Sequence, residues 1–133
     1  MIYYLDTNIV IYTVENDAVF GPKADARLAA IQAGGDSLMI SDLTRMECLV
    51  GPLKSGDTVV EGDFLTFFTG AGVQIVGISA SVCDRAARIR ATTSFKPMDA
   101  LQLAAAVEHG ADVFLTNDHR LDTFTDVKVE VLT

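Results

Sequence analysis

Short apolar runs recur along the chain and predict five β-strands. The first, residues 2–5, is a continuous apolar run that ends at Asp6, as expected of a strand buried on both faces of a parallel sheet. Similar runs cover residues 37–40, 73–78, 113–115 and 127–131. Each run has the length of an ordinary strand and is too short to cross a membrane.

The segments between these runs have capping residues and hydrophobic spacing typical of helices. The expected helices cover approximately residues 8–15, 22–33, 42–50, 58–68, 80–91 and 97–109. Gly51 and Pro52 are expected to end the third helix, while Pro97 begins the last and Gly110 ends it. Strands that alternate with helices predict an α/β domain whose parallel sheet is covered by helices on both faces.

Length and composition predict a single domain over residues 1–133. The chain is 50% hydrophobic, enough for a real core, and no linker or repeat divides it. It begins without a basic leader or signal-peptide pattern. Cys48 and Cys83 form no paired motif, and both are expected to be buried, reduced thiols. These features predict a soluble cytoplasmic protein with no membrane partner.

The formal net charge of −8 restricts the function. Proteins that bind nucleic acid by charge alone are usually basic, so that class is excluded. An enzyme that acts on nucleic acid through bound metal ions is not excluded, because the metals reverse the sign of the local charge. An excess of acid also favours a basic partner protein.

Four acidic residues lie where the predicted fold would bring ligands together. Asp6 and Asp118 follow predicted strands, Asp99 lies in the first turn of the last helix, and Glu47 lies on the helix after the second strand. Each has an ordinary explanation when taken alone. Asp6 can cap a helix, Glu47 can hold its carboxylate in water, Asp99 suits the helix dipole, and Asp118 suits an Asn-Asp turn.

The hydrophobic spacing places two of these acids near buried faces. Met46 and Val50 mark the expected apolar face of their helix, and Glu47 points with them. A carboxylate in that position is costly unless it is paired or binds a metal. Asp99 and Gln102 border the expected buried stripe of the last helix.

Taken together, the acids predict a divalent-metal site. The carboxyl ends of parallel strands meet at one edge of the sheet, which is where ligands bind in such folds. Clustered carboxylates repel one another unless a cation lies between them. Oxygen ligands without a histidine cluster favour Mg²⁺ or Mn²⁺ over zinc, and neither His109 nor His119 is an expected ligand.

Four motifs occur in order along the whole chain, and together they carry a family resemblance. They are the strand followed by Asp6-Thr7-Asn8, the run Ser41-x-x-Thr44-x-x-Glu47, the helix start Asp99-Ala100-Leu101-x-x-Ala104, and Leu115-Thr116-Asn117-Asp118. The sequence resembles the PIN-domain ribonucleases, most of all the small single-domain toxins of VapBC toxin–antitoxin pairs.

The resemblance implies a fold, an activity and partners. It implies a Rossmann-like five-stranded parallel sheet and a Mg²⁺-dependent endoribonuclease that hydrolyses RNA. It also implies inhibition by a cognate antitoxin and frequent homodimers. The family's metal-binding acids correspond to Asp6, Glu47, Asp99 and Asp118. Its small polar helpers correspond to Asn8, Thr44 and Thr116.

The expected mechanism is hydrolysis by a metal-activated water. Asp6 and Asp99 are the expected direct ligands, while Glu47 and Asp118 hold a second ion or orient waters. Positive charge for the RNA phosphates has four candidates close to the acids in sequence, and ordinary surface charge explains each of them equally well. They are Arg45, Lys54, Lys96 and Arg120.

Three other readings compete with a ribonuclease. A haloacid-dehalogenase-like phosphatase needs a second Asp two positions after the first, where this chain has Asn8. A response-regulator receiver needs a Lys after a late strand, and none follows closely here. The remaining alternative is a catalytically silent module that binds RNA or a partner. Separately, the stripe carried by Val60, Phe64, Phe67 and Phe68 is expected to pack on the sheet, and the family resemblance implies a groove or dimer face there as the alternative.

Overall fold

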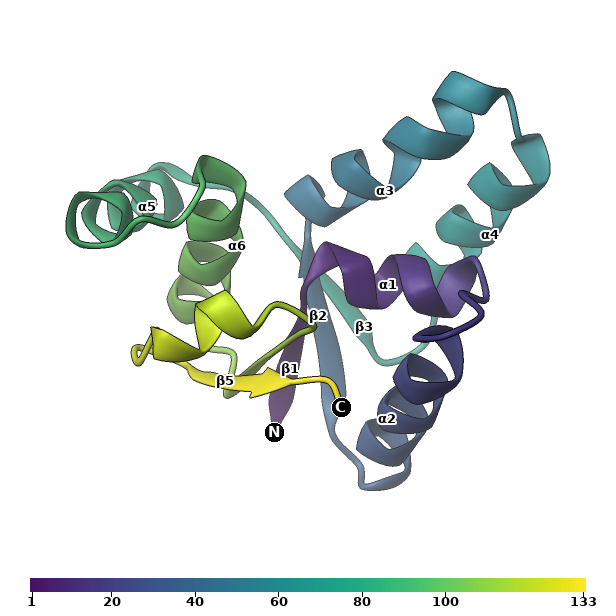
Figure 1. Ribbon diagram of the computed structural model, residues 1–133, viewed down its shortest axis with the longest axis horizontal. Coiled ribbons are helices and arrows are strands. Elements are labelled where there is room, and N and C mark those ends of the chain that lie inside the picture. The colour runs from purple at the N-terminus through teal and green to yellow at the C-terminus, as the bar shows by residue number, and fades with distance from the viewer.

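The computed structural model describes the whole chain, residues 1–133, as one twisted parallel sheet between two layers of helices (Figure 1). The five strands lie in the order β3-β2-β1-β4-β5, and every neighbouring pair is parallel. Their bounds are β1 (Ile2–Leu5), β2 (Ser37–Ser41), β3 (Val73–Val76), β4 (Val113–Thr116) and β5 (Lys128–Val131). The predicted α/β fold with a five-stranded parallel sheet is therefore confirmed.

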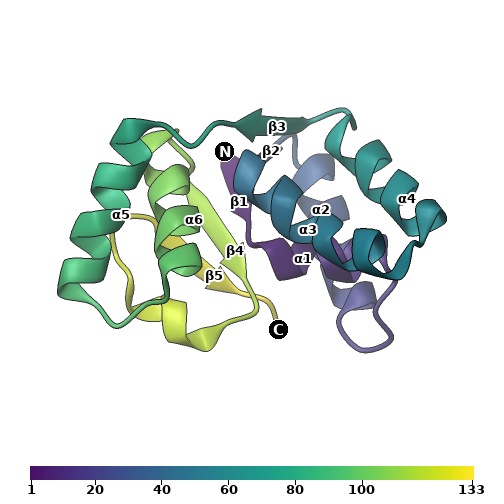
Figure 2. The same ribbon diagram turned by 90° about the horizontal axis from the view of Figure 1, so that it is seen from above.

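Six α-helices and one short 3-10 helix connect the strands. They are α1 (Thr7–Val14), α2 (Gly21–Ala33), α3 (Asp42–Ser55), α4 (Thr58–Phe68), α5 (Ala80–Thr92), α6 (Pro97–Glu108) and η1 (His119–Thr123). Helices α1 to α4 cover one face of the sheet, and α5 and α6 cover the other (Figure 2). None of these helices combines the length and apolarity that a membrane crossing requires.

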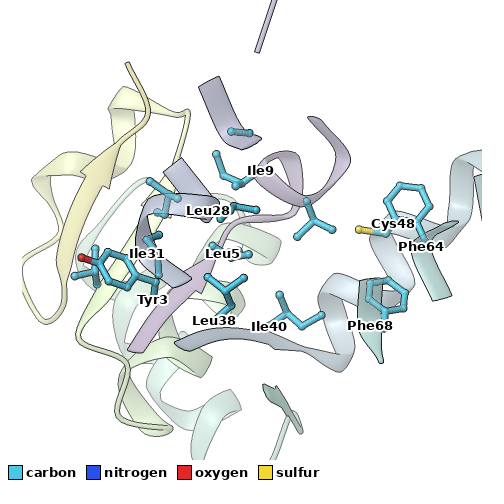
Figure 3. Packing of buried hydrophobic residues seen from close by; sticks show 14 residues of the cluster. Tyr3, Leu5, Ile9, Leu28, Ile31, Leu38, Ile40, Cys48, Phe64 and Phe68 are labelled. Atoms are coloured by element: carbon cyan, nitrogen blue, oxygen red, sulfur yellow. The ribbon is translucent and has the colours of Figure 1, made fainter. Parts of the chain in front are cut away.

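The central strand β1 contributes to two separate cores because its side chains alternate between the faces of the sheet. Leu5 packs with the helices α1 to α4, whereas Tyr4 points to the side of α5 and α6. Figure 3 shows the first core, in which Phe64 and Phe68 of α4 lie beside Cys48 of α3. Cys48 is buried as expected, whereas Cys83 of α5 is exposed, so the expectation that both thiols are buried was wrong. Burial on both faces explains why β1 reads as a continuous apolar run rather than an alternating one.

The second core combines an aromatic stack on the sheet with small side chains on α6. Tyr4 stacks on Phe114 of β4 with ring centroids 5.4 Å apart. Helix α6 presents a buried face rich in alanine, including Ala100 and Ala104, both of which are fully buried. Small residues let α6 approach both the sheet and α5 closely.

Helix α3 differs from the prediction because it continues past Gly51 and Pro52 to Ser55. A proline inside a helix removes one backbone hydrogen bond, yet α3 carries Pro52 in its interior, in a buried position. The helix ends instead at Gly56, whose backbone is left-handed with φ 71°. The expected stop at Gly51 and Pro52 was wrong.

The buried face of α3 was also predicted wrongly. Its buried residues are Thr44, Cys48 and Pro52, which are spaced four apart. Met46 and Val50, the expected core residues, are 47% and 43% exposed. The helix is rotated so that its small residues pack inward and several of its large apolar side chains face solvent.

Candidate metal centre

The four predicted acids converge on one open pocket at the carboxyl edge of the sheet. Asp6 follows β1 directly, Asp118 lies two residues after β4, Asp99 is in the first turn of α6, and Glu47 is in the second turn of α3. All four line a pocket of about 300 Å³. Parallel strands end at the same edge, which explains how residues so far apart in sequence meet here.

Asp6 is held in place by two hydrogen bonds. Thr116 Oγ1 donates to Asp6 Oδ2 at 2.7 Å, and the backbone N–H of Thr7 donates to Oδ1 at 2.8 Å. The pKa of Asp6 is raised to about 6 as a net result: burial raises it most, the two hydrogen bonds lower it, and the charges of Asp99 and Glu47 add to the rise. A cation in the pocket would relieve this cost of ionising Asp6.

Asp6 also caps helix α1, so its ordinary explanation holds at the same time as its place in the pocket. Its own backbone N–H donates to the Leu115 carbonyl at 2.9 Å, which extends the pairing of β1 with β4 by one residue. The backbone around Asp6 is therefore fixed by the sheet on one side and by the helix on the other.

Glu47 is half-buried, and one of its carboxylate oxygens accepts two hydrogen bonds. Thr7 Oγ1 donates to Glu47 Oε1 at 2.7 Å, and Gln102 Nε2 donates to the same oxygen at 2.8 Å. The Gln102 side chain comes from α6 and is only 2% exposed. Helices on opposite faces of the sheet therefore meet at the Glu47 carboxylate.

Asp118 and Asp99 share a cation supplied by the chain itself. Arg120 Nε donates to Asp118 Oδ1 at 3.0 Å and Arg120 Nη2 donates to Oδ2 at 2.5 Å, and these hydrogen bonds hold the pKa of Asp118 below its usual value. Arg120 Nη2 lies 3.9 Å from Asp99 Oδ2. Burial and then the charge of Asp118 raise the pKa of Asp99, while Arg120 and Lys96 lower it.

The residues fit a hard divalent cation by their chemistry. Four carboxylates and no histidine line the pocket, and burial and mutual repulsion already raise the pKa of Asp6 and Asp99. As the side chains stand, no three His, Cys, Asp or Glu residues are arranged to hold one ion together. The pairing of Arg120 with Asp118 shows that a positive group is already drawn to this place.

The three expected polar helpers occupy different places. Thr116 contacts Asp6 directly and also accepts a hydrogen bond from the Asp118 backbone at 3.0 Å. Asn8 is exposed at the rim of the pocket. Thr44 is buried and accepts from the Ser41 backbone at 3.2 Å, and its hydroxyl donates to Gln102 Oε1 at 3.4 Å. Any effect of Thr44 on the acids is therefore indirect.

Of the four basic residues near the acids in sequence, two reach the pocket. Lys96 and Arg120 line it. Arg45 instead lies over the ring of Phe68, 5.3 Å from its centroid, and Lys54 is in the last turn of α3. Neither histidine lines the pocket.

Sequence reasoning missed Thr7 and Gln102 as contacts of Glu47. Thr7 appears in the first motif without a role of its own, and Gln102 only as a border of the buried stripe. Gln102 is in fact fully inside the protein, so that expectation was wrong. One signal was available, because Gln102 lies three residues after Asp99 and so on the same side of α6.

Comparisons with known proteins agree with this architecture. The family model described as the PIN domain matches residues 3–127. A chain of the VapBC2 complex from Rickettsia felis, solved with a DNA fragment from its promoter, superposes with a TM-score of 0.83 at 20% identity, and the match covers 100% of both chains. No curated protein sequence matches the chain.

Two further solved structures share the fold at low identity. A toxin–antitoxin complex from Klebsiella pneumoniae gives a TM-score of 0.68 at 24% identity, covering 95% of this chain and 98% of that one. The sarcin–ricin loop cleaving toxin VapC20 from Mycobacterium tuberculosis gives 0.71 at 14% identity, with the same coverage.

Proposed function

The chain belongs to the PIN domain family, and on that premise we propose that it is a divalent-metal-dependent endoribonuclease. One observation carries the proposal. Four carboxylates from four different elements line a single pocket at the ligand-binding edge of a parallel sheet. The raised pKa of Asp6, about 6, supports a site that is incomplete without a positive ligand.

Mg²⁺ is the proposed ion, and Mn²⁺ is its expected substitute, because the donors are all oxygens. A bound ion of this kind lowers the pKa of a water molecule and neutralises charge on the phosphate. Asp6 and Asp99 are the proposed direct ligands. Glu47 and Asp118 are proposed to hold a second ion or to orient waters.

The chain's own residues prepare the site in three ways. Thr116 and the Thr7 backbone fix both oxygens of Asp6, so this carboxylate needs no reorientation before binding. Lys96 and Arg120 line the pocket and supply positive charge for the phosphates on either side of the scissile bond. Asn8 at the rim offers an amide that can donate to the RNA.

The same proposal makes the chain the toxin of a toxin–antitoxin pair. The solved structures with this fold include toxin–antitoxin complexes and a toxin that cleaves the sarcin–ricin loop. Helices α3 and α4 expose several large apolar side chains, which suits a protein partner. They are Met46, Val50, Leu53, Val59 and Leu65.

A basic antitoxin is the proposed partner for that surface, because the chain carries a net charge of −8. Expression of the chain alone is expected to arrest growth, and co-expression of the cognate antitoxin is expected to restore it. A second copy of the chain is the other possible occupant. The molar mass of the purified chain, measured by light scattering, distinguishes a homodimer from a monomer.

Metal binding and RNA cleavage measured together test the enzymatic proposal. Mn²⁺ is titrated into the chain by calorimetry, and total RNA is incubated with Mg²⁺ or with EDTA. Asp99→Asn should lose both binding and cleavage, whereas Asp84→Asn, an exposed acid on α5, should keep both. A parent chain that binds no Mn²⁺ and cuts no RNA would instead be a silent binding module.

A further inference from the structure

Gln102 is the most deeply buried polar side chain of α6, and its surroundings call for an explanation. It is 2% exposed, and its buried neighbours on the helix are Leu103 and alanines. Burying an amide group is unfavourable unless its donors and its acceptor all find partners. A methionine would fill the same space without that requirement. The amide is therefore expected to have a hydrogen-bond partner for each of its polar atoms.

The nitrogen and the oxygen of the Gln102 amide both have hydrogen-bond partners, and only one of the two amide orientations permits all of these bonds. Gln102 Nε2 donates to Glu47 Oε1 at 2.8 Å and to Thr7 Oγ1 at 3.1 Å. Gln102 Oε1 accepts from the hydroxyls of Tyr4 and Thr44. Rotating the amide by half a turn would place its carbonyl oxygen against a carboxylate oxygen of Glu47, which is repulsive.

Ser41, Tyr4 and Gln102 form a chain of hydrogen bonds in which each group donates to the next one along, ending at Glu47. Gln102 Oε1 can only accept, so the single hydroxyl hydrogen of Tyr4 goes to it. The Tyr4 oxygen is then free to accept from Ser41 Oγ, 2.8 Å away. Each group in this buried chain donates in one direction, and such chains strengthen their members. The last acceptor is Glu47 Oε1, which also receives the hydroxyl of Thr7 at 2.7 Å.

The two oxygens of the Glu47 carboxylate have different surroundings. Oε1 is tied to the protein interior by Thr7 and Gln102. Oε2 makes no hydrogen bond to the protein, and Glu47 lines the pocket with the other acids. Fixing one oxygen of a carboxylate orients the other, which is how partners outside the ligand shell tune a metal ligand.

We propose that Gln102 is a positioning residue of the site, which holds Glu47 so that its free oxygen faces the pocket. The inference rests on the proposed function and adds to it a residue from the opposite helical layer. Gln102 touches neither RNA nor metal. It acts on Glu47 directly and by way of the Thr7 hydroxyl. It also links the acids to the buried hydroxyls of Tyr4 and Thr44.

The test replaces the amide by an apolar group of similar shape. Gln102→Met should weaken Mn²⁺ binding about tenfold and lower kcat about 10- to 100-fold, the range for partners of metal ligands, with KM for RNA within about twofold. Leu103→Val is the matched control, because Leu103 is fully buried next to it and does not line the pocket. It should destabilise the fold while leaving Mn²⁺ affinity and kcat unchanged.

A second pair of variants tests whether Gln102 acts through Glu47. In a Glu47→Gln background, Gln102→Met should cause no further loss of Mn²⁺ affinity, because the group it orients is gone. An equal loss in both backgrounds would overturn the inference. Should Gln102→Met fail to fold by circular dichroism, the double variant Gln102→Met with Tyr4→Phe carries the same expectation, since it also removes the hydroxyl that would lose its acceptor and adds no charge.

The outcomes separate this inference from the proposed function. A parent chain that binds Mn²⁺ and cuts RNA, together with a Gln102→Met variant that does both equally well, overturns the role of Gln102 alone. A parent chain that does neither overturns both proposals. Losses of the same size in Gln102→Met and Leu103→Val would mean that Gln102 serves stability only, and this also overturns the inference.

Discussion

The pocket has two halves that are built in different ways. Asp6 and Glu47 are held from the protein interior, by Thr116 and Thr7 in one case and by Thr7 and Gln102 in the other. Asp99 and Asp118 instead face a long side chain from the surface, Arg120, whose side chain is 65% exposed. The interior half, Asp6 and Glu47, is fixed by buried donors, and the surface half, Asp99 and Asp118, is neutralised by an exposed cation.

This difference indicates how the chain keeps four like charges together before a metal binds. The interior half leaves Asp6 costly to ionise, as its raised pKa of about 6 records. The surface half is relieved by Arg120, which lowers the pKa of Asp118. A surface ion pair is weak and is readily exchanged, whereas a buried donor set is not. We therefore expect the interior half to set geometry and the surface half to open for the ligand.

The largest effect is expected from a change of Asp6, in the interior half. Asp6→Asn should reduce RNA cleavage by about 100-fold or more, since it removes a direct ligand rather than a supporting partner. Asparagine caps helices as well as aspartate does, so α1 should remain intact. Cleavage rates at saturating Mg²⁺ measure the loss, and Asp84→Asn is the control. Cleavage at the parent rate would remove Asp6 from the site.

The next effect is expected from the donor that fixes Asp6. Thr116→Val keeps the shape of a buried side chain but removes the hydroxyl that binds Asp6 Oδ2 and accepts from the Asp118 backbone. Cleavage should fall about 10- to 100-fold, and stability should fall by about 1–3 kcal/mol because a polar group loses its partner. Thr116→Ser retains the hydroxyl and should recover most of the activity. If serine did not rescue, packing rather than hydrogen bonding would explain the loss.

The pH dependence of stability sharpens the comparison without any cleavage assay. The pKa of Asp6 is about 6 in the folded chain and 3.8 as its ordinary value, so between these two pH values the folded state holds more protons than the unfolded state. The metal-free protein should therefore lose about 2 kcal/mol of stability as the pH rises from about 4 to 6.

Asp6→Asn removes the titrating group and should largely abolish that contribution, which makes the metal-free variant more stable than the parent at neutral pH. Urea unfolding in EDTA at several pH values measures both chains. A parent and a variant with parallel pH curves would show that Asp6 does not titrate in this range. With the expected result, the variant is inactive but more stable than the parent at neutral pH, the opposite of what a folding defect produces.

The smallest effect is expected from a change of Arg120, which pairs with the surface half. Arg120→Gln removes the internal cation that a metal ion must displace from Asp118, so Mn²⁺ affinity should rise about two- to fivefold, as suits an exposed ion pair. The gain should shrink at high salt, because salt screens the pair in the parent. Unchanged or weaker Mn²⁺ binding in calorimetry would mean that Arg120 does not compete with the ion.

Much of the fold could be predicted because its signals are local. Continuous apolar runs mark strands buried on both faces. The helices expected from residues 58 and 80 begin at those residues, capped by Asp57 and Ser79. The rule that ligands bind at the carboxyl ends of parallel strands then directs attention to Asp6 and Asp118. No contact between distant residues is needed for these steps.

The errors occurred where distant packing decided the outcome. Helix α3 continues through Pro52, which is buried, and burial of Pro52 depends on neighbours elsewhere in the chain. The partners of Gln102 are equally distant in sequence, 98 residues away for Tyr4 and 55 for Glu47. Helical spacing places Gln102 on one face of α6, but it does not show that the buried hydroxyls of Tyr4 and Thr44 donate to its amide oxygen.

The sequence by itself determined the order of elements, the parallel sheet and the identity of the acids, because periodicity and the order of motifs are properties of the chain. The tertiary structure alone decided how each acid is held. Hydrogen bonds to Glu47 from Thr7 and Gln102, and the pairing of Arg120 with Asp118, depend on distances between side chains. These distances are fixed only when the two helical layers pack on the sheet, and burial sets the pKa of Asp6 by the same packing.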